Sequence, residues 1–204
     1  FSAKHAKMIL GVTQEIADYQ CTTHDIQKPA EPFPNGVDTD AVSLLEDKRD
    51  PRQLNAVFIC GTFSDWHGLD KLITAIDNYK PATNALPLTL HLIGKMTEKQ
   101  ILMLSETKRR RQVFKIYGLL DTDDYISILA KADIGITSLA LERKGLAEAS
   151  TLKVREMLAM GLPVYSGHRD IALPANKPFV HVTNAVELSD LVEFATSTKA
   201  LQRN

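Results

Sequence analysis

The sequence is poor in cysteine and lacks the residue spacings that commonly hold metal ions. Only two cysteines, Cys21 and Cys60, occur in 204 residues, which is too few for a disulfide framework. No His-x-x-x-His or Cys-x-x-Cys spacing is present, so we expect no metal cofactor. There is also no Walker loop and no Gly-x-Gly-x-x-Gly after a strand, which argues against nucleotide hydrolases and dehydrogenases.

An excess of charge of one sign and long apolar runs are also missing. Lys and Arg number 24 against 25 Asp and Glu, so we expect no nucleic-acid partner. No run of about 20 apolar residues is present to span a bilayer, and no signal peptide is recognisable. Together with the scarce cysteine, this favours a cytoplasmic location. The basic run 108–111 is interpreted as a solvated helix end that complements the helix dipole; the alternative is a weak contact with anionic headgroups at the inner face of the membrane.

What the sequence does contain is a regular alternation of apolar strands and amphipathic helices from Leu54 onward. Strands are expected at 54–60, 88–94, 112–117, 132–137, 162–166 and 179–182, and helices at 69–79, 97–108, 123–132 and 185–199. The alternation predicts an α/β fold, a Rossmann-like parallel sheet with helices on both faces. Such sheets bind ligands at the carboxyl ends of their strands.

A short strand, a helix and a polar segment precede this alternation. Residues 7–12 predict a strand, and Thr13 is expected to cap the helix that follows. Residues 21–40 carry three prolines and show no periodicity, so we expect a linker there.

The stretch 148–167 combines a helix, a glycine and a short strand, and it carries the strongest functional signal. Ser150 or Thr151 is expected to cap the helix, and Gly161 is expected to end it. The backbone N–H groups of a first helical turn are unpaired, and Lys153 lies beside them in the sequence. The start of this helix is therefore a predicted phosphate site.

Two acidic residues frame the same helix. Glu148 and Glu156 are separated by seven residues (149–155), a spacing that places both on nearly the same helical face. One acid would then bind a sugar and the other a ribose, with a diphosphate between them. The alternative is a solvated helix face without function.

The pattern Glu148, seven residues, Glu156 and then MLAMGLPV resembles the nucleotide-sugar motif of family-4 (group 1) glycosyltransferases, which have the GT-B fold. Leu152 and Lys153, ahead of the second acid, are similar to those of bacterial polysaccharide-type members. Residues 33–38, Phe-Pro-Asn-Gly-Val-Asp, resemble the connector between the two halves of such enzymes. The resemblance covers nearly the whole chain. It implies that residues 1–34 are the end of an amino-terminal acceptor domain plus linker, and that residues 35–204 are the carboxyl-terminal donor-binding domain.

The loop after the strand 54–60 resembles the family's phosphate-binding loop. The resemblance implies donor contacts by Gly61, Thr62, His67 and Gly68. Many members have Arg after the first glycine and Lys before the second, where this chain has Thr62 and His67. Lys153 and the helix amino ends would then neutralise more of the phosphate charge, with His67 as a further donor. A surface histidine without function is an equally weighted alternative.

The join between the strand 112–117 and the next helix resembles the family's nucleobase-binding segment. By position, this implies base contacts by Ile116, Tyr117 and Gly118. An ordinary strand aromatic is the slightly favoured alternative for Tyr117.

The family likeness implies a retaining transfer of sugar from a UDP- or GDP-type sugar to a saccharide or lipid-linked acceptor in bacterial polysaccharide synthesis. Glu148 and Lys153 are the implied catalytic residues: Lys153 stabilises the leaving diphosphate and Glu148 holds the sugar. Glu156 would accept hydrogen bonds from the ribose. The backbone around the helix start would share the diphosphate, through Ser150, Thr151 and Leu152.

Two other functions fit the same sequence. An epimerase of the GT-B fold would turn over a nucleotide sugar without an acceptor. A non-enzymatic interaction domain would explain the missing Arg–Lys pair around Gly61. If the chain is the donor domain of a glycosyltransferase, we expect it to bind nucleotide but to transfer nothing by itself, because the acceptor-binding half is missing.

Overall fold

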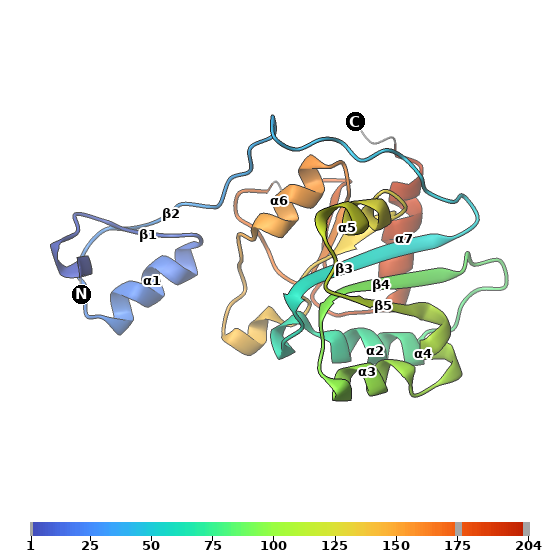
Figure 1. The fold of residues 1–204 in the computed structure, drawn as a ribbon. Coiled ribbons are helices and arrows are strands. Elements are labelled where there is room, and N and C mark those ends of the chain that lie inside the picture. Colours follow the sequence, from blue (N-terminus) through green and yellow to red (C-terminus); the bar gives the residue numbers. More distant parts are fainter. Residues whose placement is uncertain (1, 174–176, 202–204) are drawn as a thin grey trace.

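The computed structural model describes residues 2–173 and 177–201, which form a small amino-terminal unit beside a larger sheet domain (Figure 1). The small unit consists of a 3-10 helix η1 (Ser2–His5), strand β1 (Ile9–Gly11), helix α1 (Gln14–Thr23) and strand β2 (Ala30–Pro32). The predicted cap is confirmed, because the Thr13 hydroxyl accepts a hydrogen bond from the Ile16 N–H at 3.2 Å.

The predicted linker of residues 21–40 is wrong in one respect, because it contains β2. This strand pairs in parallel with β1, and the Phe33 N–H extends the pairing with a 2.6 Å hydrogen bond to the Gly11 carbonyl. A three-residue strand that ends in proline has no periodicity by which a sequence would reveal it. The chain after it crosses the sheet domain, where the Lys48 N–H donates to the Ala130 carbonyl at 3.1 Å.

Six parallel strands form the sheet of the larger domain, in the order β5-β4-β3-β6-β7-β8. Their bounds are β3 (Leu54–Thr62), β4 (Leu88–Lys95), β5 (Phe114–Gly118), β6 (Ile134–Ile136), β7 (Val164–Ser166) and β8 (Val180–Val182). The predicted parallel α/β fold is confirmed. Strand order switches direction between β3 and β6, and loops at the carboxyl ends of strands diverge at such a switch to leave room for a ligand.

Helices cover both faces of this sheet (Figure 1). One face carries α2 (Leu69–Asn78), α3 (Glu98–Ser105), α4 (Lys108–Val113) and α7 (Leu188–Lys199), and the other carries α5 (Thr122–Leu129) and α6 (Leu152–Ala159). The central strand β3 is buried on both sides: Phe58 packs in the first layer and Val57 in the second. No helix in the described part of the chain is long and apolar enough to cross a membrane.

The helix predicted at 97–108 is present as α3, but it ends at Ser105, and a second helix, α4, follows it. The Thr107 hydroxyl accepts from the Arg110 N–H at 3.1 Å and so starts a second helix. Helix α4 also takes Gln112 and Val113, so β5 begins at Phe114, later than predicted.

The basic run therefore starts a helix rather than ending one. Arg109 and Arg111 nevertheless donate to the carbonyls of Tyr79 and Ser105, at the carboxyl ends of α2 and α3. The two arginines thus complement the dipoles of the neighbouring helices α2 and α3 rather than that of their own helix.

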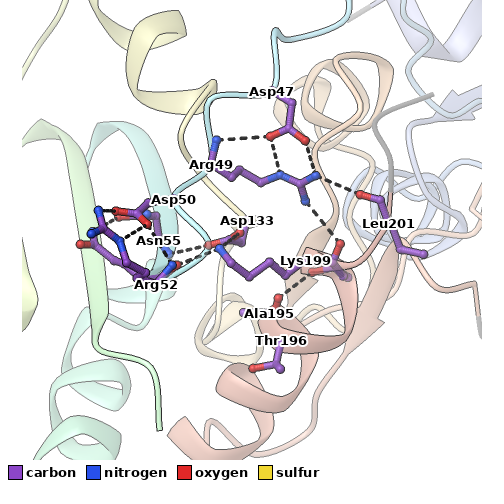
Figure 2. Close-up of polar contacts among 12 residues, drawn as sticks. Asp47, Arg49, Asp50, Arg52, Asn55, Asp133, Ala195, Thr196, Lys199 and Leu201 are labelled. Carbon is purple, nitrogen blue, oxygen red and sulfur yellow. Dashed lines mark hydrogen bonds and ion pairs between the residues drawn. The ribbon is translucent and has the colours of Figure 1, made fainter.

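The end of the sheet opposite to the strand carboxyl ends is held by a polar cluster (Figure 2). Asp133, fully buried, accepts from the Asn55 N–H at 2.8 Å and from the Lys199 ammonium at 2.9 Å. Arg49 donates to the Leu201 carbonyl at 3.0 Å, just past the end of α7. These bonds join the start of β3 to the end of α7 and fix that end of the domain.

Candidate functional site

The loop after β3 is fixed against the loop after β6, on the two sides of the strand-order switch. The Leu139 N–H donates to the His67 carbonyl at 3.1 Å, and the Ala140 N–H donates to the Trp66 carbonyl at 3.2 Å. Gly68 makes this contact possible, because its φ is 73° and a Cβ there would lie 2.9 Å from the Leu139 Cβ. Gly61 and Thr62, by contrast, are exposed.

His67 is held within this loop as a neutral hydrogen-bond donor. Its Nδ1 accepts the Ser64 N–H at 2.9 Å, so the ring proton resides on Nε2. Burial, and then the nearby charge of Lys153, lower the pKa of His67 below its usual value. At neutral pH the ring therefore offers an uncharged N–H beside the end of β3.

Lys153 extends from the first turn of α6 to the carboxyl end of β3. Its ammonium donates to the Ile59 carbonyl, two residues before Gly61. Burial raises the pKa of the adjacent Cys60 thiol to about 11 although the charge of Lys153 acts in the opposite direction. The charge of Lys153 acts on His67, so both residues lie near the carboxyl end of β3, and their shared role in binding phosphate stays a prediction.

Among the described residues, no side chain caps the amino end of α6. Thr151 takes the N-cap position, but its hydroxyl makes no capping hydrogen bond. The Ser150 hydroxyl instead accepts the Asn35 N–H at 2.8 Å, and the Asn35 side chain donates to the Ser150 carbonyl. The connector therefore docks directly in front of the motif helix, next to the exposed Leu152. The first-turn N–H groups of α6 have no side-chain acceptor in the part of the chain that the structure describes.

Glu148 and Glu156 do not share a helical face, and this prediction is wrong because α6 begins only at Leu152. Glu148 lies ahead of the helix in an isolated parallel bridge with Arg169, and its Oε1 accepts from the Arg169 guanidinium at 2.8 Å. Glu156 lies on α6 and is exposed. The two carboxylates therefore reach any ligand from different elements.

Glu15, in the small amino-terminal unit, contacts the same stretch of chain and was missed in the sequence. Its carboxylate accepts the Ala147 N–H at 2.9 Å and the Glu148 N–H at 3.0 Å. Only a long-range contact map would reveal such a pairing, because 133 positions separate Glu15 from Glu148.

A buried ion pair lies beneath this stretch. Arg155 on α6 donates to both carboxylate oxygens of Asp170, and the two side chains are only 6% and 5% exposed. The pair holds the loop after β7, and this loop carries Arg169 to Glu148. The sequence does not indicate this pair, because an arginine in an amphipathic helix is expected to lie at the surface.

The three predicted base-binding residues, Ile116, Tyr117 and Gly118, differ from one another in how free they are to contact a ligand. The Tyr117 hydroxyl bonds the His91 Nδ1 at 2.8 Å and the two rings are stacked, so its side chain is already engaged on one face of the sheet. Ile116 is exposed and Gly118 has a φ of 72°. A base contact at this loop would therefore come from Ile116 or from the backbone.

A hollow of about 880 Å³ is lined by Glu148 and Arg169 and by residues of β8 and α7, whereas Lys153 is not among its lining residues in the described chain. Two Asp-x-Asp spacings also occur, at 38–40 and 121–123, but the described residues contain no group of three side chains placed to hold a metal ion.

Comparison with known proteins gives matches only at the level of structure. No protein-family model matches the chain, and no curated protein matches it by sequence. Sucrose-phosphate synthase from Thermosynechococcus elongatus matches with a TM-score of 0.65 at 13% identity, over 97% of this chain and 50% of that one. A variant of S. aureus TarM, in complex with fondaparinux, alpha-GlcNAc-glycerol and UDP, matches with a TM-score of 0.64 at 13% identity, over 97% and 38%.

A single domain also matches. The C-terminal domain of the group 1 glycosyltransferase LpcC from Francisella tularensis has a TM-score of 0.51 at 16% identity, and the match covers 78% of this chain and 85% of that domain. The chain has the fold of the carboxyl-terminal domain of GT-B glycosyltransferases. This GT-B domain spans half the length of the sucrose-phosphate synthase chain. At such low identities the likeness establishes the fold, and activity must be argued from the site.

Proposed function

We propose that this GT-B domain binds the nucleotide-diphosphate sugar of a group 1 glycosyltransferase at the switch between β3 and β6. One observation carries the proposal: the Lys153 ammonium, the uncapped amino end of α6 and the neutral ring of His67 all lie at the carboxyl end of β3. A lysine and free helical N–H groups are the usual partners of a diphosphate.

In this proposal Lys153 takes the place of the missing Arg–Lys pair around Gly61. Charge builds on the diphosphate as the sugar departs, and a fixed ammonium with fixed N–H donors stabilises it without reorganisation. His67 Nε2–H adds a neutral donor, and the exposed Gly61 and Thr62 leave the backbone of the loop open to the ligand.

The two acidic residues take separate tasks. Glu148 is bound to Arg169 through Oε1, while Oε2 has no partner in the described chain and can accept a sugar hydroxyl. Glu156 would accept the ribose hydroxyls from its exposed position on α6. Backbone groups of Ser150, Thr151 and Leu152 complete the diphosphate site. The loop at Ile116–Gly118 forms the base site.

The proposed reaction is a retaining sugar transfer to a saccharide or lipid-linked acceptor, in the cytoplasm or at the inner face of its membrane, in bacterial polysaccharide synthesis. Support for the fold comes from the solved structures, and the UDP bound to TarM supports a uridine or similar nucleotide. Transfer would need an acceptor-binding half, of which residues 1–34 supply only the end, so this chain alone should bind without transferring.

Calorimetric titration of UDP and of GDP into the chain tests the proposal. A charge-assisted hydrogen bond contributes roughly 1.5–3 kcal/mol, so Lys153→Ala should weaken binding of the preferred nucleotide about ten- to hundredfold. Lys80→Ala is the control, because it removes the same charge from an exposed residue that follows α2 at the other end of the sheet. Equal affinities in the two variants would contradict the proposal.

A non-enzymatic interaction domain is the second candidate, favoured by Thr62 and His67 at the positions where Arg and Lys would neutralise phosphate. Absence of any nucleotide affinity would support it. An epimerase of the same fold would instead convert a nucleotide sugar without an acceptor, which chromatography of an incubated UDP-sugar would detect.

A further inference from the structure

A second hollow lies at the opposite end of the sheet from the motif helix. It has about 220 Å³ of space and is lined by three lysines, Lys48, Lys115 and Lys131. Lys131 follows the carboxyl end of α5 and Lys115 is the second residue of β5, so the hollow opens beside the starts of the strands. One ordered water needs only roughly 10–15 Å³ by this measure.

Hydrogen-bonded polar side chains line the hollow. The Tyr117 hydroxyl donates to His91 Nδ1 at 2.8 Å, and His91 Nε2–H donates to Asn55 Oδ1 at 3.0 Å. Gln53 Nε2 donates to the same oxygen at 2.6 Å. Asn55 and His91 are only 4% and 7% exposed.

The amide nitrogen of Asn55 has no hydrogen-bond partner among the described residues, although the side chain lines the hollow. A buried N–H donor without an acceptor costs free energy, and native proteins rarely leave one unsatisfied. An acceptor in the hollow would satisfy it.

The charges around the hollow define what that acceptor should be. Asp50, the carboxylate at its rim, is paired with Arg52 at 3.1 Å, and Lys48 is paired with Glu46 at 2.7 Å, so these charges cancel. Lys115 and Lys131 have no carboxylate partner in the part of the chain that the structure describes. Burial, and then the charges of these two lysines, lower the pKa of His91 to about 4, so the ring between them is neutral.

We propose that this hollow is a binding site for a phosphate group, separate from the diphosphate site at α6. A dianion balances the two unpaired ammonium groups, and one of its oxygens accepts from the Asn55 amide. The proposal does not depend on the proposed function, because the groups that would bind the phosphate, Asn55, Lys115 and Lys131, are not among the residues assigned to the donor site.

The test is a titration of the whole chain with inorganic phosphate at low ionic strength, followed by calorimetry and by NMR of side-chain amides. The Asn55 amide resonances should shift on binding. Lys115→Met/Lys131→Met should weaken binding at least tenfold, because both ammonium groups are lost. Lys28→Met/Lys80→Met is the matched control, since it removes two exposed lysines outside the hollow and should leave the affinity unchanged.

Glycerol phosphate in a parallel titration distinguishes the source of the phosphate group. Tighter binding than inorganic phosphate identifies a phosphate monoester, and weaker binding identifies the free ion. The proposal is overturned if the Asn55 resonances do not move, or if the lysine pair can be removed without loss of affinity. Binding that is lost in Lys153→Ala but kept in Lys115→Met/Lys131→Met would also overturn it, by placing the phosphate at α6.

Discussion

Replacing Arg155 with alanine would leave the Asp170 carboxylate buried without its cation. In the native chain the guanidinium donates to both carboxylate oxygens, at 2.5 and 3.0 Å. The Asp170 side chain is only 5% exposed, so water cannot replace the lost partner without opening the loop after β7.

The expected loss of stability is large. Removing one partner of a buried ion pair costs about 3–5 kcal/mol, a substantial part of the roughly 5–15 kcal/mol that stabilises a domain. The neighbouring pair of Arg169 and Glu148 is the contrast, because Arg169 is 72% exposed. Removing Arg169 should cost no more than about 1 kcal/mol.

Urea unfolding followed by the fluorescence of Trp66, the single tryptophan, measures both variants. Arg155→Ala should lower the midpoint strongly, and Arg169→Ala should change it little. The double variant Arg155→Leu/Asp170→Leu should recover much of the loss, because an apolar pair leaves no buried charge. A loss below about 1 kcal/mol in Arg155→Ala would refute the reasoning, since it would mean that the pair is solvated.

Three other changes test separate parts of the structure. Gly68→Ala should destabilise the domain by at least about 1 kcal/mol, because of its positive φ and the close Leu139 Cβ; an unchanged melting temperature would show that the loop relaxes. The pKa of His91 is about 4 in the folded chain and near 6.5 in the unfolded chain. The neutral ring therefore contributes up to about 3 kcal/mol to the free energy of unfolding above pH 6.5, and this contribution is lost as the pH falls towards 4. His91→Gln should remove that part of the pH dependence, as equilibrium unfolding between pH 4 and 7 would reveal. Glu15→Gln should accelerate hydrogen exchange at the Glu148 amide, which loses its anionic acceptor. Unchanged exchange would contradict a stabilising contact between the amino-terminal unit and the sheet domain.

The sheet could be predicted from the sequence because each of its strands has a recognisable local sequence pattern. Runs such as Leu54–Cys60 are β-branched and apolar, and the helices between them have their own caps, as at Thr97 and Asp121. The misjudged elements are those where the local signal is weak. Thr107 inside a helical pattern gave little sign that it starts a new helix, and β2 is too short to show a period.

The candidate site was predicted less completely because its geometry depends on contacts that are distant in sequence. Spacing alone placed Glu148 and Glu156 on one helix, yet Glu148 is held by Arg169 and Glu15 ahead of that helix. The position of Lys153 beside His67 could be expected, because both belong to segments at the carboxyl ends of parallel strands. The docking of Asn35 on Ser150 could not, since nothing local specifies it.

The most direct measurement of the central claim is a backbone NMR titration of the chain with UDP and GDP, with the corresponding nucleosides as controls. A diphosphate, but not a nucleoside, should shift the amides of Leu152 and Lys153 at the start of α6, together with the ring of His67. Shifts confined to other parts of the chain, or the same shifts with the nucleoside alone, would contradict that claim.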